Sequence, residues 1–158
     1  MRTQSKACST VCRDYNLFMN ATEFFTSLEQ EFNGAVARRD SHLLDSRFLA
    51  PDYALRISLQ PDRPLSRKEW LEMLRVYNVH QWGMRVGEVR DLGNVAIAHI
   101  IITQNVDVNG VDRSGDFFLV DVWQRISAAG DRLDAKAWRL AARYSSPLQD
   151  VGPMPGTR

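Results

Sequence analysis

The sequence predicts a single α+β domain in which helices pack on one face of an antiparallel sheet. Helical patterns with one short strand among them fill residues 20–77, and long strand patterns separated by turn dipeptides fill the chain from His80 onward. Helices followed by a meander of strands are typical of this class. A length of 158 residues suits one hydrophobic core. We place the domain at residues 20–147, between a flexible arm at 1–19 and a tail at 148–158.

Two helices begin at capping boxes, in which an N-cap side chain and the acid three residues later bond to each other's backbone. The first starts at Asn20, with Glu23 as the acid, and carries apolar residues at helical spacing as far as Arg39. Another starts at Ser66, with Glu69 as the acid. Both helices should therefore turn an apolar face towards the core.

A shorter helix and a first strand lie between these two. Asp40 caps the short helix, and we expect Pro51 to stop it because proline disrupts helical hydrogen bonding. Residues 52–59 alternate in polarity and predict a strand. The prolines of residues 61–64 predict a loop.

Four long strands complete the predicted sheet, at residues 81–92, 95–108, 117–126 and 137–145. The dipeptide Asn109-Gly110 is a strong hairpin signal. A turn there pairs Asp121 with Ala98 and points His99 towards the opposite face of the sheet. We expect that face to be the outer, subunit-contact surface.

Composition narrows the function classes. A net charge of +1 gives no electrostatic reason to expect nucleic acid or a membrane surface as partner. The N-terminal residues lack the apolar segment of a signal peptide, so we expect a cytoplasmic protein. Cys8 and Cys12 have no second cysteine pair or nearby histidine to complete a zinc site, which favours plain thiols over a metal or redox clip. The three histidines also lack metal-ligand spacing, and we expect neither metal nor cofactor.

Several short stretches carry a resemblance to a known family. They are Asp52-Tyr53, Leu65–Trp70, Leu92–Ala96, Gly110–Phe117, Asp121–Arg125 and Trp138–Ser146. In these stretches and in the order of its elements, the chain resembles the nuclear transport factor two-like superfamily, and within it the SnoaL-like group. The resemblance implies a curved antiparallel sheet wrapped around N-terminal helices, a cone shape with an internal pocket, and a homodimer formed through the sheet. It does not imply one activity, because this fold hosts isomerases, dehydratases, cyclases and non-catalytic modules.

Asp121 is the main candidate for chemistry. It lies within an apolar run, where a carboxyl group is costly to ionise without a partner but can donate a hydrogen bond when protonated. It resembles the oxyanion-hole aspartate of ketosteroid isomerases. The same resemblance places the general base of those enzymes at Ile57 and their oxyanion tyrosine near Phe32, and neither side chain can do that work. Steroid-type isomerisation is therefore not predicted.

The alternative role for Asp121 is a structural ion pair. By the same resemblance, Arg139, Ala141, Arg143 and Ser145 face the pocket, and Arg143 can reach Asp121. The candidate catalytic residues are thus Asp121, Arg143 and Tyr53. The candidate ligand-binding residues are Phe32, Ile102, Gln104, Phe117 and Trp123.

Two functions stay open from the sequence. One is a cofactor-independent isomerase, cyclase or lyase that takes a small apolar molecule. The other is a non-catalytic ligand-binding or dimerisation module.

Overall fold

The computed structural model describes residues 20–127 and 130–149. The predicted arm at 1–19, with Cys8 and Cys12, and the tail from residue 150 lie outside the described residues. The helices are α1 (Ala21–Ala37), α2 (Ser41–Leu43), the π-helix η1 (Leu44–Phe48), α3 (Arg67–Met73) and the 3₁₀-helices η2 (Leu74–Val76) and η3 (Ala135–Ala137). The strands are β1 (Leu49–Ile57), β2 (Gln60–Ser66), β3 (Tyr77–Asp91), β4 (Val95–Val108), β5 (Val111–Asp112), β6 (Gly115–Arg125) and β7 (Trp138–Pro147).

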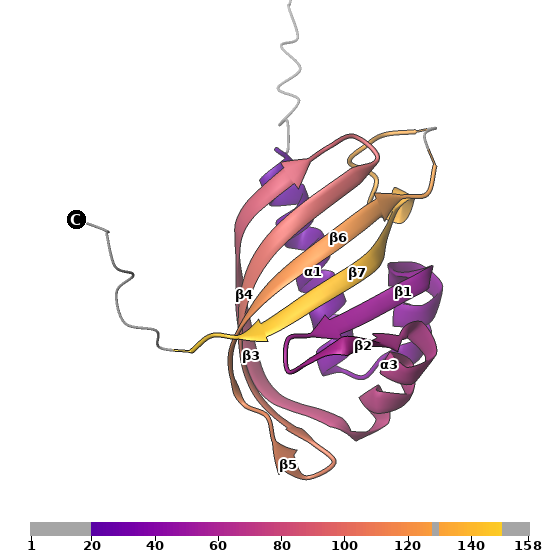
Figure 1. The fold of residues 1–158 in the computed structure, drawn as a ribbon. Coiled ribbons are helices and arrows are strands. Elements are labelled where there is room, and N and C mark those ends of the chain that lie inside the picture. Colours follow the sequence, from indigo (N-terminus) through magenta and orange to yellow (C-terminus); the bar gives the residue numbers. More distant parts are fainter. Residues whose placement is uncertain (1–19, 128–129, 150–158) are drawn as a thin grey trace, which may run out of the picture.

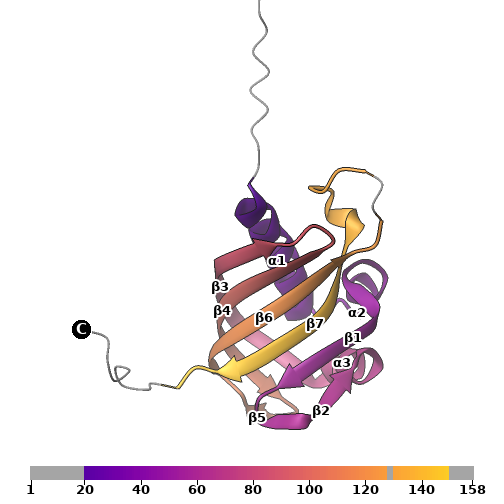
Figure 2. The ribbon, with the colours of Figure 1, turned by 45° about the horizontal axis from the view of Figure 1, so that its top comes forward.

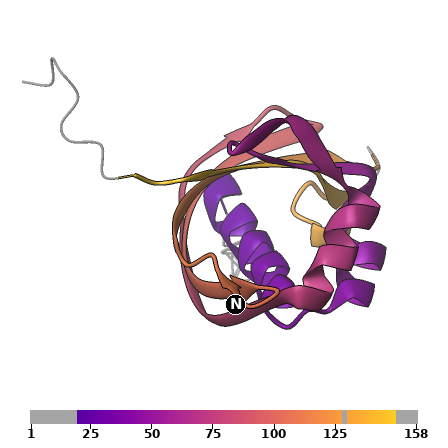
Figure 3. The ribbon, with the colours of Figure 1, turned by 60° about the horizontal axis from the view of Figure 1, so that its bottom comes forward.

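The strands form one curled sheet in the order β2-β1-β7-β6-β4-β3, with β5 paired to β4 (Figures 1 and 2). Neighbouring strands run antiparallel except β1 and β7, which run parallel. Seen from below, the sheet wraps around α1, and α3 lies across the opening of the curve (Figure 3). The result is the cone-like α+β fold that the sequence predicts.

The predicted capping boxes are both present. The side chain of Asn20 accepts from the Glu23 amide at 2.9 Å, and the Glu23 carboxylate accepts from the Asn20 amide at 3.2 Å. Ser66 and Glu69 form the same pair of bonds at the start of α3. These local interactions fix where the two helices begin, and therefore which of their residues face the sheet.

The predictions around Pro51 and residues 61–64 are wrong. The chain enters β1 already at Leu49, and Pro51 lies inside that strand. Its missing N–H is tolerated because the ladder between β1 and β7 is interrupted between Leu49 and Ala54. Residues 61–64 belong to β2, an edge strand, where a proline N–H can be absent without breaking an interior ladder.

The predicted hairpin register is confirmed, but a bulge in the last strand changes which of its residues face inward. Ala98 pairs with Asp121, as predicted from the turn at Asn109-Gly110. Between β6 and β7 the register shifts, so that Arg143 lies opposite Asp121 but Leu140 lies opposite Trp123. Arg139 consequently faces outward, contrary to the prediction.

The two faces of the sheet differ in burial. Inward side chains of the central strands, such as Ala98, Ile100 and Leu119, are buried with the core that α1 and α3 complete. The outward side chains His99 and Val120 are only half-buried, and Phe118 and Tyr144 are exposed. Within the described residues, no helix is long and apolar enough to cross a membrane.

Candidate functional site

A cavity of about 590 Å³ lies between α1, α3 and the inner face of the sheet. Its volume falls in the range of small-molecule sites. Most of its wall is apolar, and Trp70, Leu74 and Leu119 close the buried end. The exposed side chains of Leu59 and Arg113 lie at the open end. The concave shape and mainly apolar wall suit a small, mainly apolar molecule.

Arg143 is the ionised side chain at the buried end of this cavity, and it is bound by Asp121. Its Nε donates to Asp121 Oδ1 at 2.7 Å and its Nη2 to Asp121 Oδ2 at 2.5 Å. Such a two-point contact fixes the guanidinium plane as well as its position. Asp121 is fully buried and does not line the cavity, whereas Arg143 does. The carboxylate thus holds the arginine at the cavity wall.

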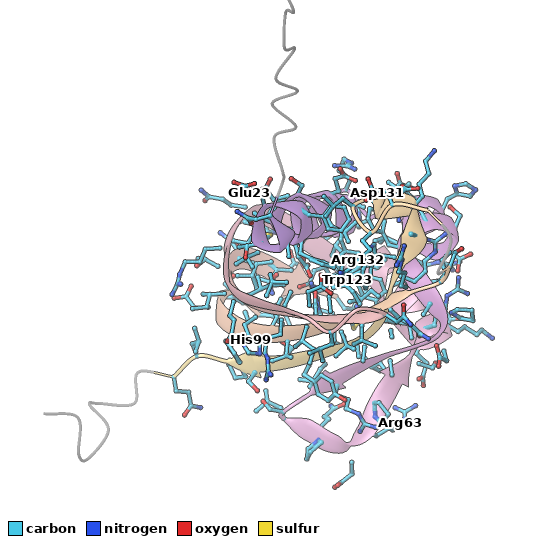
Figure 4. All side chains as sticks on the ribbon, turned by 90° about the horizontal axis from the view of Figure 1, so that it is seen from above. Glu23, Arg63, His99, Trp123, Asp131 and Arg132 are labelled. Atoms are coloured by element: carbon cyan, nitrogen blue, oxygen red, sulfur yellow. The ribbon has the colours of Figure 1, made fainter. Side chains whose placement is uncertain are left out.

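Two side chains from α1 complete the cluster. Asn33 Oδ1 accepts from Arg143 Nη1 at 3.0 Å, and Glu29 Oε2 lies 3.5 Å from Arg143 Nη2. Glu29 Oε1 accepts from the Trp123 indole at 2.6 Å. The guanidinium carbon of Arg143 also lies 4.8 Å from the centre of the Phe32 ring. Helix and sheet are therefore joined by one buried polar network. Figure 4 labels Trp123, a member of this network on β6.

Glu29 and Asn33 were not among the site residues predicted from the sequence. A usable signal existed, because both lie on the buried stripe of α1 that also carries Phe25, Leu28 and Phe32. A polar pair four residues apart on such a stripe needs a buried partner. The partner could not be identified without knowing where Arg143 lies.

The protonation states within the cluster follow from burial. Removal from water raises the pKa of Glu29 well above its ordinary value of 4.5, and the neighbouring negative charge of Asp121 raises it further. Arg143 and the indole of Trp123 oppose this without cancelling it. For Arg143, burial acts to lower the pKa, but Asp121 outweighs it and the pKa rises above its ordinary value. The favoured state is thus an ion pair of Arg143 with Asp121 beside a neutral Glu29.

Tyr53 lies in the core rather than on the cavity wall. It is buried, packs against Trp70 with ring centres 5.6 Å apart, and its hydroxyl has no hydrogen-bond partner among the described residues. Burial raises the pKa of Tyr53, so the phenol stays neutral.

The structure separates the predicted ligand-binding residues into two groups. Ile102, Gln104 and Phe117 line the cavity, and Gln104 Oε1 accepts from the Tyr77 hydroxyl at 3.1 Å. Phe32 and Trp123 are fully buried in the core beside Arg143 and do not line the cavity. The part of the chain that the structure describes contains no cluster of His, Cys, Asp and Glu suited to a metal ion.

A larger depression, about 800 Å³, lies between α2, η1, β1, β2 and α3, and the buried Tyr53 is one of the residues that line it. It is open to solvent and lined by side chains of both charges, among them Asp45, Arg67 and Lys68. Its ion pair between Arg67 and Asp45 is partly exposed, whereas the pair of Arg143 with Asp121 is buried. The cavity beside Arg143 is therefore the better candidate site.

Comparison with solved structures identifies the fold. An NTF2-like protein from Cytophaga hutchinsonii superposes with a TM-score of 0.70 at 12% identity, covering 82% of this chain and 100% of that one. A ketosteroid isomerase-like protein from Erwinia carotovora gives 0.62 at 15% identity, covering 84% and 99%. A putative calcium/calmodulin-dependent kinase II association domain from Exiguobacterium sibiricum gives 0.64 at 13% identity, covering 80% and 92%.

These similarities confirm the nuclear transport factor two-like fold; membership of the SnoaL-like group stays a prediction. No protein-family model matches the chain, and no curated protein matches it. At such low identities the shared fold carries no activity with it. Function must therefore be argued from the cavity and the polar network.

Breaking the ion pair should cost more stability than replacing it. Asp121→Leu leaves Arg143 buried without its counter-ion, and we expect it to lower the free energy of unfolding by about 3–5 kcal/mol. Combining Asp121→Leu with Arg143→Met removes the stranded charge and should recover most of this loss. Urea unfolding measures both. Arg63→Met, which removes an exposed ion pair with Glu69, is the control and should cost about 1 kcal/mol or less. A double variant no more stable than Asp121→Leu would contradict the charge argument.

Glu29 should make stability depend on pH. Because folding raises its pKa, Glu29 contributes stability that is complete below its ordinary pKa of 4.5 and is lost as pH rises through the folded-state value. Glu29→Gln keeps the hydrogen-bonding shape but cannot ionise, so its stability should fall less steeply above pH 4.5. Urea unfolding across a pH series gives the slope, which for one group is at most about 1.4 kcal/mol per pH unit. The exposed neighbour Glu31, changed to Gln, is the control. Equal slopes in the wild type and Glu29→Gln would rule out a neutral Glu29.

Proposed function

We propose that this protein binds a small, mainly apolar molecule in the cavity between α1, α3 and the sheet. The observation that carries the proposal is a mainly apolar, partly open hollow of about 590 Å³ whose lining includes the oriented, buried guanidinium group of Arg143. Apolar walls supply affinity, and a few fixed polar groups supply orientation.

In this proposal Arg143 contacts the ligand and its neighbours position it. An arginine has five N–H donors, and four are directed at Asp121, Asn33 and Glu29. One N–H of Nη1 is left without a partner among the described residues, and Arg143 is one of the residues that line the cavity. Asp121, enclosed behind Arg143, acts as a positioning residue. The proposal therefore favours binding over acid catalysis by Asp121.

A second copy of the chain is the proposed partner. The outer face of β4, β6 and β7 presents Ile101, Phe118, Val120 and Tyr144, an apolar group around His99. His99 and Phe118 contact each other there, with ring centres 5.7 Å apart. One of the similar structures is named an association domain, which supports assembly through this fold. A two-fold dimer is the commonest way to cover such a face.

Filling the cavity should weaken ligand binding. We expect Nile red, a neutral apolar dye, to bind the wild type, and Val79→Trp, on the cavity wall, to weaken that binding about tenfold or more. Val95→Trp, on the other face of the sheet, is the matched control and should bind like the wild type. Fluorescence titration gives the affinities, and mass spectrometry of molecules that copurify identifies the natural ligand. The proposal fails if the wild type neither binds the dye nor copurifies with a small molecule.

Charge on the outer face should dissociate the dimer. Tyr144→Glu places a carboxylate among apolar side chains that a second copy would bury, so we expect a shift from dimer to monomer. Val111→Glu changes an exposed apolar residue at the hairpin tip and should leave the dimer intact. Sedimentation velocity measures both. A monomeric wild type, or a Tyr144→Glu variant that remains dimeric, would remove this interface.

A further inference from the structure

Two arginines outside the cavity converge on one backbone oxygen. Arg139, on β7, donates from Nη1 to the carbonyl oxygen of Trp138 at 2.9 Å and to that of Lys136 at 2.8 Å. Arg47, at the end of η1, approaches the same Trp138 oxygen with its own Nη1 at 3.5 Å. Because both contacts end on one atom, the two guanidinium groups lie side by side. The β-bulge of β7 creates this arrangement by turning Arg139 outward.

Neither arginine has a carboxylate partner in the described parts of the chain. Arg63, Arg67 and Arg132 each form an ion pair with an acidic side chain, but none of the ion pairs among residues 20–127 and 130–149 involves Arg47 or Arg139. The nearby acids are Glu31 and Asp134, whose charges act on Arg47 without direct contact. The Asp134 carboxylate is already engaged with the Lys136 amide at 2.9 Å.

Holding these two cations together is unfavourable for the protein alone. Both arginines are half-buried, and burial lowers the pKa of each. The charge of Arg47 lowers the pKa of Arg139 further. Like charges that are partly removed from water repel each other more strongly than charges in bulk solvent. A negative group between them would remove this cost.

The hydrogen-bond donors of the pair are also mostly unused. Each guanidinium group carries five N–H donors, and the recorded contacts involve only Nη1 of each. The Nε and Nη2 donors of both residues have no partner among the described residues. The guanidinium carbon of Arg47 lies 4.8 Å from the centre of the Phe48 ring, and this contact restrains the position of the group. Forks of this kind match the two oxygens of a carboxylate or phosphate.

We propose that Arg47 and Arg139 bind an oxyanion, a phosphate or carboxylate group, through their free Nε and Nη2 donors. The Trp138 carbonyl oxygen repels an anion, so the group lies on the side of the guanidinium forks away from that oxygen. Neither arginine lines the apolar cavity, and this site is separate from it. A test of this anion site is therefore independent of the function proposed for the cavity.

Phosphate should stabilise the folded protein by binding to Arg47 and Arg139. Sodium phosphate or sodium acetate is added to the full-length protein, with sodium chloride adjusted to keep the ionic strength constant, and the thermal unfolding midpoint is measured. An anion that binds only the folded protein raises the unfolding midpoint as the anion concentration increases. A rise with phosphate only identifies a phosphate site, and a rise with acetate identifies a carboxylate site. No rise with either, relative to chloride, overturns the proposal.

Matched arginine variants locate the effect. Arg47→Met and Arg139→Met should each lose most of the midpoint rise, whereas Arg63→Met and Arg132→Met, whose wild-type residues already have carboxylate partners, should retain it. If a methionine variant does not fold, Arg139→Lys keeps the charge but lacks the fork, and should show a reduced rise. Line broadening of the phosphate signal in phosphorus NMR gives a readout that does not depend on unfolding. A rise that persists in Arg47→Met and Arg139→Met would place the anion elsewhere and refute the assignment.

Discussion

The buried contact between Arg143 and Asp121 is the constraint on which the inside of this fold depends. Removing either charge from water costs several kcal/mol, and only close, well-oriented pairing offsets that cost. The register of β6 and β7 provides the pairing directly, since the two residues lie opposite each other in adjacent strands. With Asp121 committed to Arg143, a second carboxylate nearby is tolerated most easily as a neutral acid. Burial is the main cause of the raised pKa of Glu29, and the charge of Asp121 adds to it.

The same network determines how α1 lies in the sheet. Apolar packing alone specifies the position of α1 less sharply than polar pairing does, because many hydrophobic side chains can substitute for one another in a core. The bonds from Trp123 to Glu29 and from Arg143 to Asn33 allow no such freedom, since a shift of one residue would leave buried polar groups without partners. Asn33 and Arg143 both line the cavity. The network that positions the helix therefore also shapes the ligand site.

How far the sequence predicts this structure depends on whether the signal is local. Capping boxes and the Asn109-Gly110 turn act within a few residues, and the helix starts and the pairing of Ala98 with Asp121 were predicted correctly from them. The parallel pairing of β1 with β7 joins distant segments, and nothing local encodes it. The bulge in β7 reverses the face of Arg139, and alternation in a strand cannot reveal a bulge. The sequence shows Glu29 as a polar residue on an apolar stripe, but its role could not be inferred without knowing where Arg143 lies.

The charges of the buried and half-buried arginines in this chain are balanced by their neighbours to different degrees. Arg143 is buried more deeply than Arg47 or Arg139, yet its charge is balanced by the Asp121 carboxylate, and Nη1 also donates to the side-chain oxygen of Asn33. Arg47 and Arg139 share one carbonyl oxygen, which carries only a partial charge and cannot neutralise two cations. A purely structural role would not require two positive charges here, because neutral side chains could pack in the same place without repelling each other. What distinguishes the two cases is how far neighbouring groups balance the charge, rather than the depth of burial. Arg143 has a carboxylate partner and stabilises the fold, whereas Arg47 and Arg139 lack one and can bind an added anion.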